Sequence, residues 1–463
     1  MPDLDPTSRR ALLRRGLAGA ACATTAGCAA LQGRDDASPA EPSPGQTPSV
    51  TTTPGNAESR IQTHRTGDLA LTVRRADGTP VTDATVSVTM REHAFRFGTG
   101  VEARYLVEES SPGDPYRERL AGLFNTGVVE HRNKWRPWEN ESERELAIRA
   151  SEWLLERGLD LRGHAAIWQR FDQPVVPEDV VEKVRSDDDD RAAYVSRRTG
   201  DHVSEILGHY AGDVASWDVL NEQIHAHHLT DVIDPDASHL RAPEVVQWFE
   251  RARQADPEAS LYLNDYDVLA GEYPDYRDDY AELVRFLQER GAPIDGLGFQ
   301  AHHDGYEEAR SPDGILDTLD RFADLGVAIT VTEYDTVGDG WTDERAADHL
   351  RTFLRTVFSH PAVEGFVMWG FWDGVHWAER APLFREDWSA KPALDVYRSL
   401  VFEEWWTDET GTTDADGRYR TTAFLGKHDV TVETGGRSRS VRASVTDPVS
   451  TTELAVEGPA ESP

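Results

Sequence analysis

The chain has 463 residues, 38% of them hydrophobic, with 13 Trp, 13 Tyr and 15 Phe, which excludes a disordered chain and allows one domain of roughly 250 to 350 residues with smaller appendages. Its 83 acidic and 48 basic residues, with only four Lys among the basic ones, give a net charge of -35, so we expect neither nucleic acid nor anionic lipid headgroups as partners. Because molar salt shortens the Debye length to about 3 Å and screens this self-repulsion, the net charge predicts adaptation to very high salt. The alternative is an unusually acidic protein that works at ordinary salt concentrations.

Residues 1–32 have the features of a targeting segment. Arg9 and Arg10 form a twin arginine, and the apolar stretch 17–30 that follows is too short to span a bilayer comfortably. This pattern resembles a twin-arginine export signal and predicts an extracellular protein.

The signal ends in a candidate anchoring site. Thr25-Ala26-Gly27-Cys28 is similar to a lipoprotein processing box, so we expect a lipid anchor at Cys28 on the cell surface; small residues incidental to a cleaved signal are the alternative. Cys22 and Cys28 are the only cysteines, so a chain processed at Cys28 would form no disulfide and no Cys metal site. Residues 33–60, rich in Pro, Ser and Thr, predict a flexible tether.

Short β segments lie on both sides of the central region. Residues 61–93 are predicted to form a small β element, because apolar and polar residues alternate over 69–90 around an Asp77-Gly78 turn. Residues 403–463 predict a small β module of three or four strands with Asp-Gly and Gly-Gly turns. This module would bind sugar or cap the central domain, and its lack of clustered aromatics favours the structural role.

Between these segments, residues 94–402 repeat a strand-then-helix pattern. Helical spacing is clear over 143–157 and 280–290, and no GxGxxG or phosphate-loop motif follows an early strand. We therefore predict an α/β protein with a closed TIM (β/α)8 barrel, in preference to an open doubly wound sheet. The eight predicted strands are 95–100, 127–130, 159–168, 215–222, 261–267, 296–302, 328–335 and 365–372.

Polar residues gather at the C-terminal ends of these strands, where the active site of such a barrel lies. Glu222 ends the fourth strand and Glu333 the seventh, so the two carboxyls would face each other across the barrel mouth. Cleaving a glycosidic bond needs such a pair, one to protonate the departing oxygen and one to attack or screen the oxocarbenium-like carbon. Trp168, Trp369 and Trp377 would offer flat apolar faces to sugar rings.

Six motifs in order carry a family resemblance: GHAAIW, WDVLNE, LNDYD, GFQAHH, TVTEYD and MWGFWDGVHW. Over residues 94–400 the chain resembles glycoside hydrolase family 10, mainly endo-1,4-β-xylanases, and in charge and signal an exported member of the haloarchaeal type. The resemblance implies a retaining double displacement, with Glu222 as general acid/base and Glu333 as nucleophile. It implies that the sugar is held by Glu130, Lys134, His164, Trp168, Asn221, Gln300, His302, Trp369 and Trp377.

Finer roles follow from the same resemblance. His302 would orient Glu333, and Asn221 would bond the sugar 2-hydroxyl, a contact that strengthens as charge develops. Glu333, among hydrogen-bonding partners, should be ionised, and its charge should help to keep Glu222 protonated until the covalent intermediate forms.

The chain departs from the family pattern at two places. His131, in the stretch from Glu130 to Trp135, stands where Asn is expected, which leaves the preference of the nonreducing-side subsite open. Gln169 follows Trp168 where the family often has His.

Three further histidines follow the fourth strand. His225, His227 and His228 have the chemistry to bind Zn²⁺ or Ni²⁺, but no ligand motif surrounds them and two-carboxylate hydrolysis needs no metal, so we predict sugar contact or solvent instead. The acidic run 187–190 predicts a solvated connection between helices.

The sequence as a whole predicts a retaining endo-1,4-β-xylanase that hydrolyses xylan, is monomeric and needs no cofactor or metal. Its alternatives are activity on another β-glycan, cellulose or β-1,3-xylan, and a noncatalytic carbohydrate-binding surface protein. A purely structural cell-surface protein would leave the convergent strand-end residues unexplained.

Overall fold

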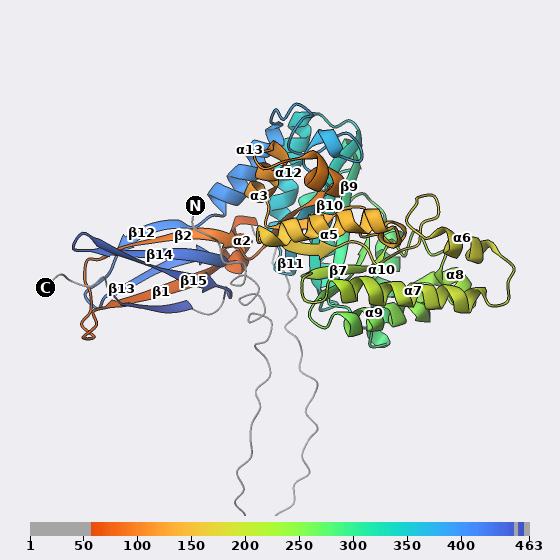
Figure 1. The fold of residues 1–463 in the computed structure, drawn as a ribbon. Coiled ribbons are helices and arrows are strands. Elements are labelled where there is room, and N and C mark those ends of the chain that lie inside the picture. The colour runs from red at the N-terminus through yellow and green to blue at the C-terminus, as the bar shows by residue number, and fades with distance from the viewer. Residues whose placement is uncertain (1–56, 449–451, 458–463) are drawn as a thin grey trace, which may run out of the picture. The chain divides into compact units, whose positions relative to one another are not determined.

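The computed structural model describes residues 57–448 and 452–457 (Figure 1). The predicted signal, Cys28 and residues 33–56 of the predicted tether lie outside these residues. The described part begins with helix α2 (Ala57–Arg65), so residues 57–60 are helical where a flexible tether was predicted. No helix within the described residues combines the length and the apolarity needed to cross a bilayer.

A parallel sheet that closes on itself forms the central domain. In the described chain it has nine strands in the order β5-β4-β3-β11-β10-β9-β8-β7-β6, and β5 also pairs with β7, so β5 and β6 together make up the third of eight barrel positions. This confirms the predicted TIM (β/α)8 barrel. The strands are β3 (Arg96–Val101), β4 (Thr126–Val129), β5 (Asp160–Gly163), β6 (Ile167–Trp168), β7 (Ser216–Asn221), β8 (Ser260–Asp265), β9 (Gly296–Gly305), β10 (Ala328–Asp339) and β11 (Val363–Met368).

Helices surround the barrel strands, as Figure 1 shows for α5, α7, α9 and α10. The helices are α3 (Pro115–Leu123), α4 (Trp135–Glu139), α5 (Glu141–Glu156), α6 (Glu178–Arg185), α7 (Arg191–His209), α8 (Thr230–Ile233), α9 (Pro243–Ala255), α10 (Pro274–Glu289), α11 (Pro312–Ala323), α12 (Asp343–Ser359) and α13 (Pro392–Ser399). Short 3-10 or π turns are η1 (Tyr105–Glu109), η2 (His239–Arg241), η3 (Tyr306–Glu308), η4 (Asp373–Val375) and η5 (Leu400–Glu404).

Local sequence signals explain where several helices start. The Asn140 side chain accepts hydrogen bonds from the backbone of Ser142 and Glu143 and so caps α5, whose apolar stripe, including Leu146, Ala150 and Leu154, is buried. The predicted helices 143–157 and 280–290 are confirmed as α5 and α10, each with an earlier start. The acidic run 187–190 is exposed between α6 and α7, also as predicted.

Strand boundaries differ from the prediction where the chain approaches the barrel mouth. The third strand was predicted as continuous over 159–168, but residues 164–166 leave the ladder, and the Ala166 N–H bonds the Asp218 carbonyl 2.9 Å away. The eighth strand ends at Met368, four residues early, so Trp369 lies beyond it. The regular strand pairing therefore ends at residues 164–166 and after Met368, close to the barrel mouth.

Both β segments outside the barrel belong to one pair of sheets. In the described residues, one sheet has the order β13-β1-β16 and the other β12-β2-β14-β15, and a shared apolar core that includes Leu71, Val86 and Val432 lies between them. The segments predicted as a separate N-terminal element and C-terminal module thus interleave. The strands are β1 (Thr66–Arg74), β2 (Thr85–His93), β12 (Asp408–Thr412), β13 (Arg418–Phe424), β14 (Gly426–Thr434), β15 (Arg437–Val445) and β16 (Thr452–Glu457).

A glycine in the third strand lets the barrel close. A Cβ on Gly163 would lie 2.2 Å from the Trp217 ring on β7, far inside contact distance. Trp217 is fully buried, so the missing side chain admits the indole and leaves the next residue, His164, at the barrel mouth.

Candidate active site

Glu222, directly after β7, and Glu333, at a bulge within β10, share an unusual backbone conformation. Each has a φ of 58°, in the left-handed region that costs a residue with a Cβ about 1 kcal/mol or more. Glu333 sits in a register shift, because Thr332 pairs with Gln300 and Asp335 with His302, which leaves two residues of β10 opposite one of β9. Such a bulge re-aims side chains, here toward the barrel mouth.

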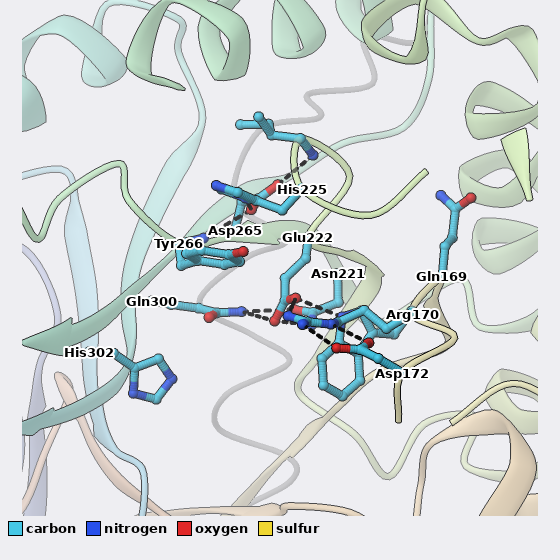
Figure 2. A network of polar contacts seen from close by, with 12 residues as sticks. Gln169, Arg170, Asp172, Asn221, Glu222, His225, Asp265, Tyr266, Gln300 and His302 are labelled. Carbon is cyan, nitrogen blue, oxygen red and sulfur yellow. Dashed lines mark hydrogen bonds and ion pairs between the residues drawn. The ribbon is translucent and has the colours of Figure 1, made fainter. Parts of the chain in front are cut away.

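A chain of amides joins the two carboxyls. The Asn264 Nδ2 donates to Glu333 Oε1 and to Asn221 Oδ1, both at 2.7 Å, while its Oδ1 accepts from Thr332 at 2.7 Å. The Asn221 Nδ2 donates to Glu222 Oε1 at 3.2 Å, and Gln300 Nε2 donates to the same oxygen at 3.3 Å (Figure 2). Glu222 and Glu333 are buried, with 6% and 4% exposure. The network thus holds both side chains in place inside the barrel mouth.

Glu333 lies in surroundings that favour its ionised form. His302 Nε2 is 3.3 Å from Glu333 Oε2, and its Nδ1 is 2.9 Å from Asp335 Oδ2. Burial acts to raise the pKa of Glu333, but the hydrogen bond from His302, the charges of His164 and His302 and the bond from Asn264 outweigh it and lower that pKa. A carboxylate suited to attack a carbon is the result.

Glu222 lies in surroundings that favour its protonated form. Burial raises its pKa, and the charges of Asp265 and Glu333 raise it further, against the hydrogen bonds from Trp168 and Gln300. The Trp168 Nε1 donates to Glu222 Oε2 at 2.8 Å. Two carboxyls in one network therefore have pKa values pushed in opposite directions, as an acid and a nucleophile require.

His164 contacts a buried ion pair formed by Arg162 and Asp218. Its Nδ1 lies 3.0 Å from Asp218 Oδ2 and 4.0 Å from Glu333 Oε1. Asp218 is paired with Arg162, and both side chains are almost fully buried. The Trp369 ring lies edge-on to the His164 ring at 4.9 Å. These contacts orient the imidazole beside Glu333.

Glu130 and His131 lie close enough to Lys134 and His164 for the charges of these two residues to act on their pKa values. The buried Lys134 Nζ is 4.6 Å from the centre of the Trp168 ring. Burial lowers the pKa of Lys134, opposed by the charges of Glu130, Glu333 and Glu222. Burial and the charge of Lys134 lower the pKa of His131 to about 4, so the residue that departs from the family pattern is a neutral imidazole at pH 7.

Trp377 is the exposed member of the predicted set. Its ring has 54% exposure, yet its Nε1 donates to Asp335 Oδ2 at 2.9 Å and the ring lies 5.6 Å from the His302 ring. Contacts link ten of the eleven predicted site residues, directly or through a shared neighbour, and the eleventh, Glu130, acts through its charge on the pKa of Lys134.

The three histidines after β7 do not form a cluster. His225 stacks on Tyr266 at 3.6 Å and bonds Asp265, His227 bonds Asp231, and His228 stacks on Phe171. No group of three His, Cys, Asp or Glu side chains in the described residues is arranged to hold a metal ion.

Gln169, the other departure from the family pattern, faces away from the carboxyls. It is fully buried, and its Oε1 accepts from the backbone N–H groups of Leu229 and Thr230, both at 2.9 Å. Its side chain thus secures the segment after β7.

Sequence reasoning did not assign several residues of the network. Asn264, Asp265 and Asp335 were visible as polar strand ends, and Arg162 and Asp218 as charges inside apolar strands, a signal of buried pairing. Arg170 and Asp172 lie in an irregular segment, where no periodicity marks them.

The fold and the carboxyl pair are those of a two-carboxylate glycoside hydrolase. A family model described as glycosyl hydrolase family 10 matches residues 87–400. The chain belongs to this family.

Two relatives of this chain are much longer than the matched region. Anti-sigma-I factor RsgI6 from Acetivibrio thermocellus is 31% identical over 390 residues, which cover 83% of this chain and 47% of that protein. Endo-1,4-beta-xylanase 1 from Arabidopsis thaliana is 26% identical over 385 residues, which cover 82% of this chain and 38% of that protein. The chain thus spans less than half the length of both relatives.

A solved structure shares the fold. Native xylanase 10B from Thermotoga maritima matches with a TM-score of 0.58 and 24% identity, covering 67% of this chain and 96% of that one.

Proposed function

We propose that this protein is a retaining endo-1,4-β-xylanase that hydrolyses internal β-1,4-xylosidic bonds of xylan. The observation that carries the proposal is the buried Glu222–Glu333 pair, linked through Asn221 and Asn264, with opposite pKa directions. A retaining mechanism requires the two carboxyl groups to lie about 5 to 5.5 Å apart. Membership of the family and the xylanase name of the Arabidopsis relative support xylan as the substrate.

In the first half-reaction Glu333 attacks the anomeric carbon and forms an ester bond to the sugar. The glycosidic C–O bond breaks, and its oxygen takes the proton of Glu222, so the leaving chain departs as an alcohol. Asn221, anchored by Asn264, is placed to bond the sugar 2-hydroxyl as charge develops.

In the second half-reaction Glu222 acts as a base. It takes a proton from water while the water oxygen bonds the anomeric carbon, and the ester electron pair returns to Glu333. Two inversions at one carbon leave the product in the β configuration.

The test is reducing-sugar release in molar KCl from β-1,4-xylan, carboxymethylcellulose and β-1,3-xylan. We expect release from β-1,4-xylan alone, with the β anomer formed first by proton NMR. Glu333→Gln should lose activity by about 10³-fold or more, the scale at which loss of a covalent nucleophile acts. Glu222→Gln should lose most activity on xylan and keep more on a dinitrophenyl β-xylobioside, whose leaving group needs no proton.

Glu244→Gln is the matched control. Glu244 is buried and burial raises its pKa, but it lies on α9, where it accepts a hydrogen bond from Ser196 on α7. It should therefore keep its activity. If the α anomer forms first, the retaining mechanism is wrong; if only another β-glycan is cleaved, the substrate is wrong.

A noncatalytic carbohydrate-binding protein is the second candidate, favoured by one observation. The relative with 31% identity is named an anti-sigma factor rather than a xylanase. This candidate predicts binding of xylan with no release of reducing sugar, and Glu333→Gln would then bind and behave as the wild type does.

A further inference from the structure

Arg170 is the one Lys or Arg within ion-pair distance of Glu222 among the described residues. Its Nη1 lies 3.5 Å from Glu222 Oε2, the oxygen that also accepts from Trp168. The family resemblance and the sequence patterns assign it no role.

A second carboxylate holds Arg170 in position. The Arg170 Nε and Nη2 donate to the two oxygens of Asp172 at 2.9 and 2.7 Å, a bidentate pair that fixes the plane of the guanidinium. Figure 2 shows Arg170 between Asp172 and Glu222. The Asp172 pair leaves Nη1 directed at Glu222.

The backbone on both sides of Arg170 is anchored as well. The buried Gln169 bonds the segment after β7 through Leu229 and Thr230, and the Phe171 ring stacks on His228 at 4.6 Å. The position of Arg170 is therefore fixed by its neighbours, although its side chain has 31% exposure.

All the polar contacts of the Glu222 carboxyl come from donors. Asn221 and Gln300 donate to Oε1, and Trp168 and Arg170 approach Oε2. Every one of them favours the carboxylate, and within the described part of the chain only Arg170 brings a full positive charge within 4 Å. The ionisable groups that face Glu222 from the packed elements are Asp265 and Tyr266 at the end of β8, Glu333 on β10, Lys134 before α4 and Arg170 after β6.

We propose that Arg170, held by Asp172, is a positioning residue that keeps Glu222 in place and favours its carboxylate form in the second half-reaction. The inference rests on the proposed function. Once Glu333 is esterified, one of the negative charges that favour a protonated Glu222 is gone. The positive charge of Arg170 then favours the ionised form of Glu222, which is the base that the attack of water requires.

The experiment compares the pH profiles of the full chain and of Arg170→Gln with phenyl β-xylobioside, whose leaving group needs a proton. Loss of the guanidinium should move the descending limb of kcat/KM, set by Glu222, to higher pH by about half a unit or more. The ascending limb, set by Glu333, should stay. With a dinitrophenyl leaving group, which needs no proton, kcat at neutral pH should fall while kcat/KM stays, because only the step that needs the base is slowed.

Further variants separate this role from a merely structural one. Arg170→Lys should restore part of the profile, and Asp172→Asn should shift it in the same direction by less, because Arg170 is still present but no longer held. Arg321→Gln is the matched control, because Arg321 pairs with Asp278 at 2.8 Å on the outer helices and should leave both limbs unchanged.

A readout without turnover keeps the inference separate from the proposed function. The Glu222 carboxyl can be titrated as the ¹³C signal of labelled glutamate that disappears in Glu222→Gln. The midpoint of this titration should rise in Arg170→Gln even if no xylan is cleaved. The absence of xylan cleavage would overturn only the proposed function. An unchanged midpoint and an unchanged descending limb would overturn the role of Arg170 while leaving the xylanase proposal intact.

Discussion

His302 lies between two carboxylates, 3.3 Å from Glu333 and 2.9 Å from Asp335. Burial works to lower the pKa of its imidazole, but the charges and hydrogen bonds of Asp335 and Glu333 raise it well above its ordinary value. The imidazolium in turn is a main reason why the pKa of Glu333 is lowered. His302 thus contributes, with His164 and Asn264, to keeping the proposed nucleophile ionised.

We expect His302→Asn to move the ascending limb of the pH profile to higher pH. Without the imidazolium, only the charge of His164 and the hydrogen bond from Asn264 oppose the effect of burial, so the pKa of Glu333 rises and fewer molecules are ionised at a given pH. The value of kcat/KM at neutral pH should fall on the order of 10²-fold. His227→Asn, at an exposed histidine paired with Asp231, is the control, and an ascending limb that does not move in His302→Asn would contradict the assignment.

At the scale of elements, the segment after β7 is held to the end of β8 by His225. Its Nδ1 lies 2.8 Å from Asp265, its Nε2 lies 3.5 Å from Asp267, and its ring stacks on Tyr266 at 3.6 Å. Burial opposes protonation, but hydrogen bonds and charges of the two aspartates raise the pKa of His225 from 6.5 to about 9. The two loops are therefore joined by a protonated imidazole at neutral pH.

This contact makes stability depend on pH in a defined window. Because the pKa of His225 is higher in the folded protein than in the unfolded chain, its contribution is full below about pH 6.5 and is lost as the pH rises through about 9. We expect the free energy of unfolding to fall by about 1 to 3 kcal/mol across this range. In His225→Asn this part of the slope should be missing; an identical slope in denaturant titrations of both proteins would refute the role.

At the scale of the whole molecule, negative charges greatly outnumber positive ones, with 83 acidic and 48 basic residues. Of 48 basic residues only four are Lys, and no Lys side chain has more than 23% exposure: Lys134 packs against Trp168, Lys183 pairs with Asp188, Lys391 with Asp373 and Lys427 with Glu92. The exposed surface therefore carries many carboxylates and almost no amines, which leaves a net self-repulsion in dilute salt.

We expect the thermal midpoint to rise when KCl is increased from about 0.1 to 2 M, because the Debye length falls from about 10 Å to under 3 Å. A rise of about 5 °C or more in differential scanning calorimetry is the expected scale. Sucrose at equal osmolality is the control, since it strengthens burial without screening charge. Equal gains in KCl and sucrose would show that screening is not the cause.

Much of the barrel could be predicted from the sequence because its signals are local. Apolar runs at regular intervals marked all eight strand positions, and polar strand ends marked the mouth where Glu222 and Glu333 lie. The third strand was predicted too long, because an apolar run does not reveal that residues 164–166 turn out of the ladder to present His164.

By itself the sequence determined the barrel, its active face and the pair of candidate carboxyls, since periodicity and strand-end chemistry are properties of neighbouring residues. Only the tertiary structure decided that β1 and β2 share two sheets with β12 to β16, that Arg170 reaches Glu222, and that the pKa values of the two carboxyls move in opposite directions. Pairing and pKa depend on distances between atoms that are far apart in the chain, and the environment of a carboxyl is created only when the chain has folded around it.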